Sequence, residues 1–100
     1  MDITVTELKA KLNAKEDFIF IDVREPYEYE EFNLNAHLIP LGNIMEAIET
    51  YGDRKEEEIV IHCRSGQRSG MAQQFMQQAG FTNVRNLTGG VLEWKRQFEG

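Results

Sequence analysis

The sequence has little cysteine and little histidine, with one of the former and two of the latter among 100 residues. A single cysteine cannot form an internal disulfide, and three such side chains are too few for a structural zinc site. Basic charge is also in deficit, and the net charge of −6 gives no whole-surface reason to bind nucleic acid or an anionic membrane. The longest apolar run, Phe18 to Ile21, is far shorter than a membrane helix requires.

The first residues also lack the features of a leader. Met1 and Asp2 do not open a basic segment followed by an apolar one, so we expect no secretory signal. Together with the unpaired cysteine, this favours a reducing, cytoplasmic location.

Short apolar runs alternate with helical patterns along the whole chain. With 41% hydrophobic and 28% charged residues, this length predicts one domain over residues 1–100. Alternating strands and helices are typical of parallel α/β construction. We expect five strands, at residues 3–5, 18–21, 38–39, 59–61 and 84–87. We also expect five helices: one capped by Thr6, one that begins at Pro26, one around residues 44–48, and two at residues 69–79 and 91–98.

The only cysteine, Cys63, stands where a buried strand ends and a helix is about to begin. Ligands of open α/β sheets bind at the carboxyl ends of strands, which marks this loop as a candidate site. The start of the following helix, Arg64 and Arg68 all favour the thiolate form, which is the nucleophile. A buried structural cysteine is the alternative, but an apolar site would not attract two guanidinium groups.

The spacing of the loop narrows its chemistry. Cys63 and Arg68 enclose the residues Arg64, Ser65, Gly66 and Gln67, and Ser69 follows. Cysteine phosphatases use a similar ring of amides that is one residue longer and accommodates a tetrahedral oxyanion. The shorter ring suits a smaller anionic group, a sulfur atom carried on the cysteine itself.

The loop resembles the six-residue active-site loop of the rhodanese (thiosulfate sulfurtransferase) family. The resemblance extends in order along nearly the whole chain, through Asp22-Val23-Arg24-Glu25, Leu38-Ile39-Pro40-Leu41-Gly42, Ala79-Gly80-Phe81 and Leu87-Thr88-Gly89-Gly90-Val91-Leu92-Glu93-Trp94. One departure is Asn35, which stands where many members have glycine. Asparagine tolerates the left-handed conformation best after glycine, so we expect that conformation there.

The resemblance implies a three-layer α/β/α fold with a mostly parallel, five-stranded sheet. It also implies transfer of sulfur from a small-molecule donor, thiosulfate or a persulfide, to a thiol or protein cysteine through a persulfide on Cys63. In this interpretation Arg64 meets an anionic donor and Arg68 holds the loop in shape. No metal or organic cofactor is implied, nor a nucleic-acid or membrane partner.

Several supporting roles and two rival functions stay open at this point. Asp22 is either an anchor for a loop arginine or a cap for the helix at Pro26. Arg24 either pairs with a surface glutamate or supports the loop from below. His62 is expected to be a packed structural residue, since neighbouring strand residues face opposite sides of a sheet. The rival functions are a non-catalytic docking module and a cysteine-loop phosphatase or arsenate reductase.

Overall fold

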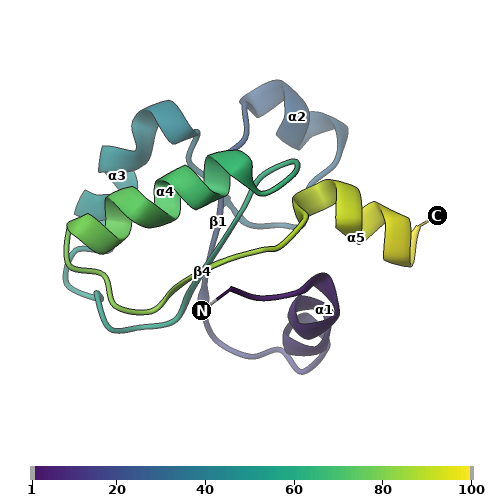
Figure 1. Cartoon of the computed structure of the whole chain (residues 1–100), viewed down its shortest axis with the longest axis horizontal. Coiled ribbons are helices and arrows are strands. Elements are labelled where there is room, and N and C mark those ends of the chain that lie inside the picture. The colour runs from purple at the N-terminus through teal and green to yellow at the C-terminus, as the bar shows by residue number, and fades with distance from the viewer. Residues whose placement is uncertain (1, 100) are drawn as a thin grey trace.

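A sheet of parallel strands lies at the centre of the computed structural model, which describes residues 2–99 (Figure 1). The strands run in the order β2-β1-β3-β4, and all three neighbouring pairs are parallel. Their bounds are β1 Ile19–Asp22, β2 His37–Leu38, β3 Ile59–His62 and β4 Val84–Asn86. The two central strands are apolar up to their last residues, Asp22 and His62, because both of their faces are buried.

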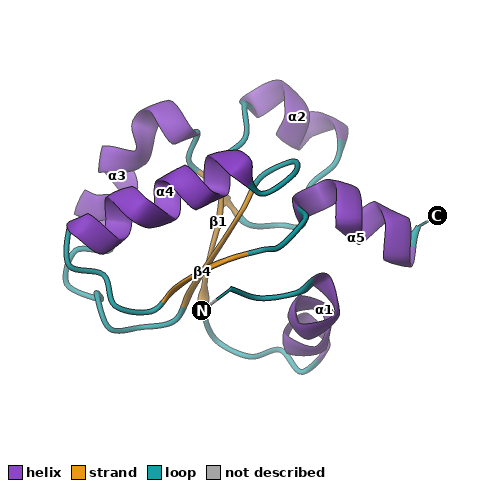
Figure 2. Ribbon diagram, in the orientation of Figure 1, coloured by secondary structure: helices purple, strands orange, loops and turns teal. Residues whose placement is uncertain are grey.

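Helices cover both faces of this sheet (Figure 2). Ile44 and Ala47 of α3 and Ala72 and Met76 of α4 belong to one apolar cluster, while Val5 and Leu8 of α1 and Trp94 of α5 belong to the other. The three-layer α/β/α arrangement expected from the sequence is therefore confirmed. The helices are α1 Val5–Asn13, α2 Pro26–Glu31, a 3-10 turn at Leu41–Asn43, α3 Ile44–Thr50, α4 Gln67–Gln78 and α5 Gly90–Phe98.

The expected fifth strand at residues 3–5 is wrong in the described part of the chain. Ile3 forms one isolated bridge to Leu87, and α1 begins already at Val5. Thr4, not Thr6, caps this helix: its Oγ1 accepts the Glu7 amide at 3.1 Å while the Glu7 carboxylate accepts the Thr4 amide. This capping box satisfies two backbone donors and ends the extended segment early.

Three smaller expectations on local structure are also tested. Helix α4 begins two residues earlier than predicted, and Phe75, expected to point inward, is 49% exposed. Asn35 does adopt the left-handed conformation, with φ of 65°.

Among residues 2–99, no helix combines the length and apolar character needed to cross a membrane.

The strand order creates one crevice at the carboxyl edge of the sheet. From β1 the chain continues to β2 on one side, whereas from β3 it continues to β4 on the other. Loops that leave two adjacent strands in opposite directions leave room between them, which is where open α/β sheets bind ligands. The segments that carry Arg24 and Cys63 leave the sheet at this edge, directly after β1 and β3.

Candidate active site

Cys63 directly follows β3 and opens the loop that leads into α4. Its side chain is only 1% exposed and belongs to the apolar cluster beneath α3 and α4. The loop turns at Gly66, which has a φ of 105° that residues with a Cβ rarely adopt. Helix α4 therefore begins at Gln67, with its first turn directed back at the sulfur.

Three groups of the loop surround the sulfur atom. The amide of Gly66 donates to Cys63 Sγ at 3.1 Å, and the amide of Ser69 donates at 3.4 Å. The Ser69 hydroxyl also lies 3.4 Å from Sγ and 2.5 Å from Asn86 Oδ1. The hydroxyl has one proton, which serves one of these two acceptors at a time. A negatively charged sulfur is the stronger competitor for it.

These contacts decide the ionisation of the thiol. Burial is the largest single influence and raises the pKa of Cys63, but the hydrogen bonds from Ser69, Gly66 and Ser65 together outweigh it and leave the pKa lowered. We predicted that Arg64 and Arg68 favour the thiolate. The hydrogen bonds carry most of that effect, since Arg64 is exposed and Arg68 is paired with a carboxylate.

Ser69→Ala should raise the pKa of Cys63. The variant lacks the Ser69 hydroxyl, which has the largest effect among the groups that lower this pKa. Thiolate absorbance against pH, with the Cys63→Ser signal subtracted, measures this pKa directly because the chain has one cysteine. The matched control is Ser65→Ala, which keeps the backbone amide. A wild-type pKa at or above the usual value of about 8.5 would contradict the assignment.

Helix α5 is attached to the same loop by its first amides. Val91 donates to the carbonyl of Cys63 and Leu92 to the carbonyl of Arg64, both at 3.0 Å. This approach depends on Gly90, where an added Cβ would lie 2.5 Å from the Cys63 carbonyl oxygen. The loop is consequently held between α4 and α5.

Arg68 closes the loop by reaching across to α2. Its guanidinium makes a bidentate pair with the Glu28 carboxylate at 2.7 and 2.9 Å. This contact is in line with the shape-holding role expected for Arg68. Hydrogen bonding to Arg68 is the main cause that lowers the pKa of Glu28 to about 2.

Glu28→Gln should lower the free energy of unfolding by about 1–2 kcal/mol at neutral pH, because a charge-assisted pair is lost. A carboxyl group whose pKa is lowered by folding stabilises the protein above its unfolded-state pKa of about 4.5, and that contribution disappears as the pH falls through about 2. Denaturant unfolding of both proteins from pH 7 downward checks this. Wild type and variant should converge in acid. A difference that stays constant with pH would contradict an electrostatic origin.

Asp22 and Arg24 form a buried ion pair that the sequence did not suggest. Arg24 Nη2 lies 2.8 Å from Asp22 Oδ2, and Asp22 Oδ1 accepts both Nε and the backbone amide of Arg24. The guanidinium also donates to the carbonyls of Glu28 and Phe32. The expectation of a surface glutamate partner for Arg24 was wrong, and so were both expected roles of Asp22. The pair fixes α2, which supplies Glu28 to the loop.

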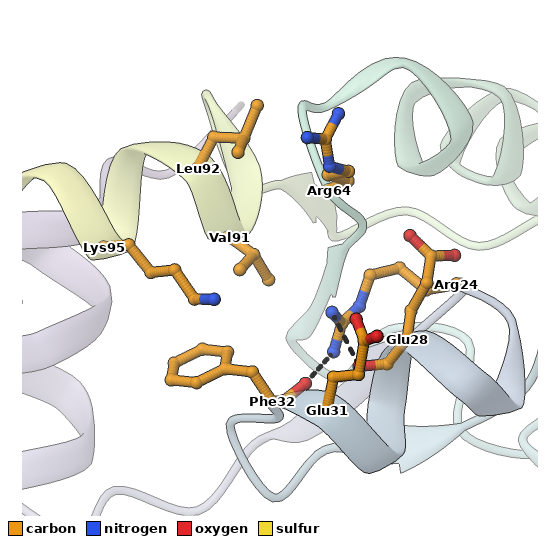
Figure 3. A pocket seen from close by; sticks show the side chains of 8 residues that line it. All are labelled: Arg24, Glu28, Glu31, Phe32, Arg64, Val91, Leu92 and Lys95. Atoms are coloured by element: carbon orange, nitrogen blue, oxygen red, sulfur yellow. Dashed lines mark hydrogen bonds between the residues drawn. The ribbon is translucent and has the colours of Figure 1, made fainter.

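The other predicted residues are distributed around the rim. Ser65 and Gln67 are exposed, and Arg64 borders a cavity of about 220 Å³ between α2 and α5 (Figure 3). His62 is fully buried, with its ring 5.3 Å from that of Phe20. Burial is the main cause that lowers its pKa to about 4, so it is neutral near pH 7. Within residues 2–99, no group of three His, Cys, Asp or Glu side chains is arranged to hold a metal ion.

Asn86 is a site residue that sequence reasoning missed. From β4, its side chain accepts from Ser69 Oγ and donates to the carbonyl of Gly66 at 3.1 Å. Both ends of the turn around the sulfur are therefore tied to a third strand. No local pattern marked it, because its partners lie 17 and 20 residues away along the chain.

Comparison with known proteins gives a consistent result along the chain. The sequence profile described as a rhodanese-like domain matches residues 4–97. A sulfurtransferase of Allochromatium vinosum is 35% identical, over 95% of this chain and 88% of that protein. The crystal structure of a rhodanese-like domain protein from Staphylococcus aureus superposes with a TM-score of 0.82 at 31% identity, covering 94% of this chain and 91% of that one. The tRNA uridine(34) hydroxylase of Enterobacter sp. (strain 638) is 33% identical over 95% of this chain, which spans 28% of that longer protein.

Proposed function

Because the chain belongs to the rhodanese-like domain family, we propose that it is a sulfurtransferase that carries sulfur on Cys63. The donor is thiosulfate or a persulfide, and the acceptor is a small thiol or a protein cysteine. Family membership alone does not define the reaction, since a tRNA uridine(34) hydroxylase contains a similar region. The observation that carries the proposal is the sulfur of Cys63 held among three hydrogen-bond donor groups, with a lowered pKa.

In the first step the Cys63 thiolate attacks the outer sulfur of the donor. A new sulfur–sulfur bond forms on Cys63, and the bond that joined this sulfur to the donor breaks. With thiosulfate, sulfite leaves with the electron pair of the broken bond. Charge is conserved, and the enzyme is left as a Cys63 persulfide.

In the second step an acceptor thiolate attacks the outer sulfur of the protonated persulfide. The acceptor becomes a persulfide, and the Cys63 thiolate leaves with the electron pair. Cyanide accepts the same sulfur as thiocyanate. Ping-pong kinetics follow from this order of events.

The loop stabilises negative charge in both steps. The amides of Gly66 and Ser69 are already directed at the sulfur, and the Ser69 hydroxyl needs only to turn from Asn86 Oδ1 toward it, so little reorganisation is needed when charge develops there. Arg64, beside the nucleophile and exposed, is assigned to an anionic donor. Arg68 is assigned to loop shape. The chain needs no cofactor for these steps. A reducing compartment such as the cytoplasm would keep its single thiol available.

The proposal is tested by thiosulfate:cyanide transfer with wild type and Cys63→Ser. The wild type should form thiocyanate and the variant should form none, because an alcohol replaces the sulfur carrier. Circular dichroism establishes that the variant is folded. Absence of transfer by the wild type from thiosulfate and from persulfide donors would favour the docking-module alternative, and hydrolysis of an aryl phosphate would favour the phosphatase.

A further inference from the structure

The cavity between α2 and α5 carries charged groups, of which the proposed reaction so far uses only Arg64. Arg64, Lys95 and Glu31 border it, together with an apolar wall of Phe32, Val91 and Leu92 (Figure 3). Arg24 and Glu28 also border it but are neutralised by Asp22 and Arg68. Among residues 2–99, neither Arg64 nor Lys95 has a carboxylate within ion-pair distance, and Glu31 has no cation.

Lys95 is directed into this cavity and lies over an aromatic ring. Its Nζ lies 4.5 Å from the centre of the Phe32 ring, a cation–π distance. In Figure 3 its ammonium points from α5 across the cavity toward α2, the helix that supplies Glu31. Two unpaired positive groups and one unpaired negative group therefore border one space.

The cavity is joined to the loop that carries the nucleophile. Arg64 follows Cys63, and the first turn of α5 donates amides to the carbonyls of Cys63 and Arg64. A ligand lying along the wall formed by Val91 and Leu92 thus starts at the edge of the sulfur-bearing loop. The volume of about 220 Å³ and the apolar wall exceed what a compact inorganic ion such as thiosulfate requires.

We propose that this cavity binds the acceptor of the second step, a small thiol of the amino-acid type. Its carboxylate meets Lys95 and Arg64, its ammonium meets Glu31, and its carbon chain lies on the apolar wall. The inference rests on the proposed function and names its acceptor class. The reaction is the second step above: the acceptor thiolate takes the outer sulfur, and the Cys63 thiolate leaves.

Four thiols that share a two-carbon unit and carry different charged groups test this assignment. Cysteine has both groups, mercaptopropionate the carboxylate, cysteamine the ammonium, and mercaptoethanol neither. Lys95→Gln should raise KM for cysteine and mercaptopropionate roughly tenfold relative to mercaptoethanol. Lys95→Arg should restore most of the loss. Glu31→Gln should raise KM for cysteine and cysteamine about threefold, because ion pairs of an exposed carboxylate contribute little.

Each variant is compared with wild type using the same thiol, so that differences in intrinsic thiol reactivity cancel. Lys15→Gln, which removes a lysine that does not border the cavity, is the matched control and should leave all four KM values unchanged. Equal KM changes for charged and neutral thiols would overturn the acceptor assignment while leaving the sulfurtransferase proposal intact.

A binding measurement separates the two proposals. If the wild type forms no persulfide, the proposed function fails, and the cavity is then tested alone by NMR on the Cys63→Ser protein. Mercaptopropionate, but not mercaptoethanol, should shift the amides of α2 and α5, and Lys95→Gln should abolish the shifts. Identical responses to the two thiols would overturn the cavity assignment.

Discussion

Inserting one glycine between Gly66 and Gln67 is expected to lower the rate of sulfur transfer by roughly 10²–10³. The insertion lengthens the ring of amides and moves Gly66 and Ser69 relative to each other, so that their donors no longer converge on the sulfur. Losing one preorganised donor in an active site typically costs that factor. Steady-state transfer from thiosulfate to cyanide measures the effect.

The matched control inserts the same glycine after Gly52, in the turn before β3. This variant should retain wild-type transfer. Circular dichroism is recorded for both insertions. An active-site insertion that is folded and transfers sulfur as fast as wild type would show that ring size does not select the chemistry, and the phosphatase alternative would regain weight.

The largest stability effect is expected for Asp22→Ala. The substitution leaves the guanidinium of Arg24 buried, with only two carbonyls in place of its carboxylate partner. Breaking a buried pair in this way costs about 3–5 kcal/mol. For a domain of this size the melting temperature should fall by roughly 12 °C or more. Denaturant and thermal unfolding both measure it.

Two further variants identify the cause. Asp53→Ala removes a carboxylate at the surface and should change stability by less than about 0.5 kcal/mol. Combining Asp22→Ala with Arg24→Leu removes both charges and should recover much of the lost stability. A loss below about 1 kcal/mol for Asp22→Ala alone would contradict the account of this pair.

Most elements of the fold were predictable because their signals are local. The runs at Phe18–Ile21 and Ile59–Ile61 are apolar throughout, which parallel strands buried on both faces require. The segment at residues 3–5 was misjudged because β-branched residues favoured a strand while Thr4 and Glu7 form a capping box. In that competition the helix signal prevailed, and one bridge to Leu87 is what remains of the strand.

The candidate site also has a part that local sequence signals predict and a part that they do not. The loop from Cys63 to Ser69 could be predicted as the site because the nucleophile and its amide donors are contiguous in sequence. The residues that this loop contacts could not be predicted, since Glu28 lies 40 residues from Arg68 and Asn86 lies 17 residues from Ser69 along the chain. Arg24 illustrates the limit most clearly: its type suggested exposure, whereas the fold buries it against Asp22. The proposed role of Lys95 could not be predicted either, because it depends on α5 and α2 bordering the same cavity.

The central claim is that Cys63 carries the transferred sulfur, and intact-mass spectrometry tests it most directly. The chain has no second cysteine to resolve a persulfide as an internal disulfide, so the intermediate should persist until an external acceptor arrives. Brief incubation with thiosulfate should add the mass of one sulfur atom to the wild type, cyanide should remove it, and Cys63→Ser should gain nothing. An unchanged wild-type mass with thiosulfate and with persulfide donors, or an equal gain by Cys63→Ser, would contradict the account.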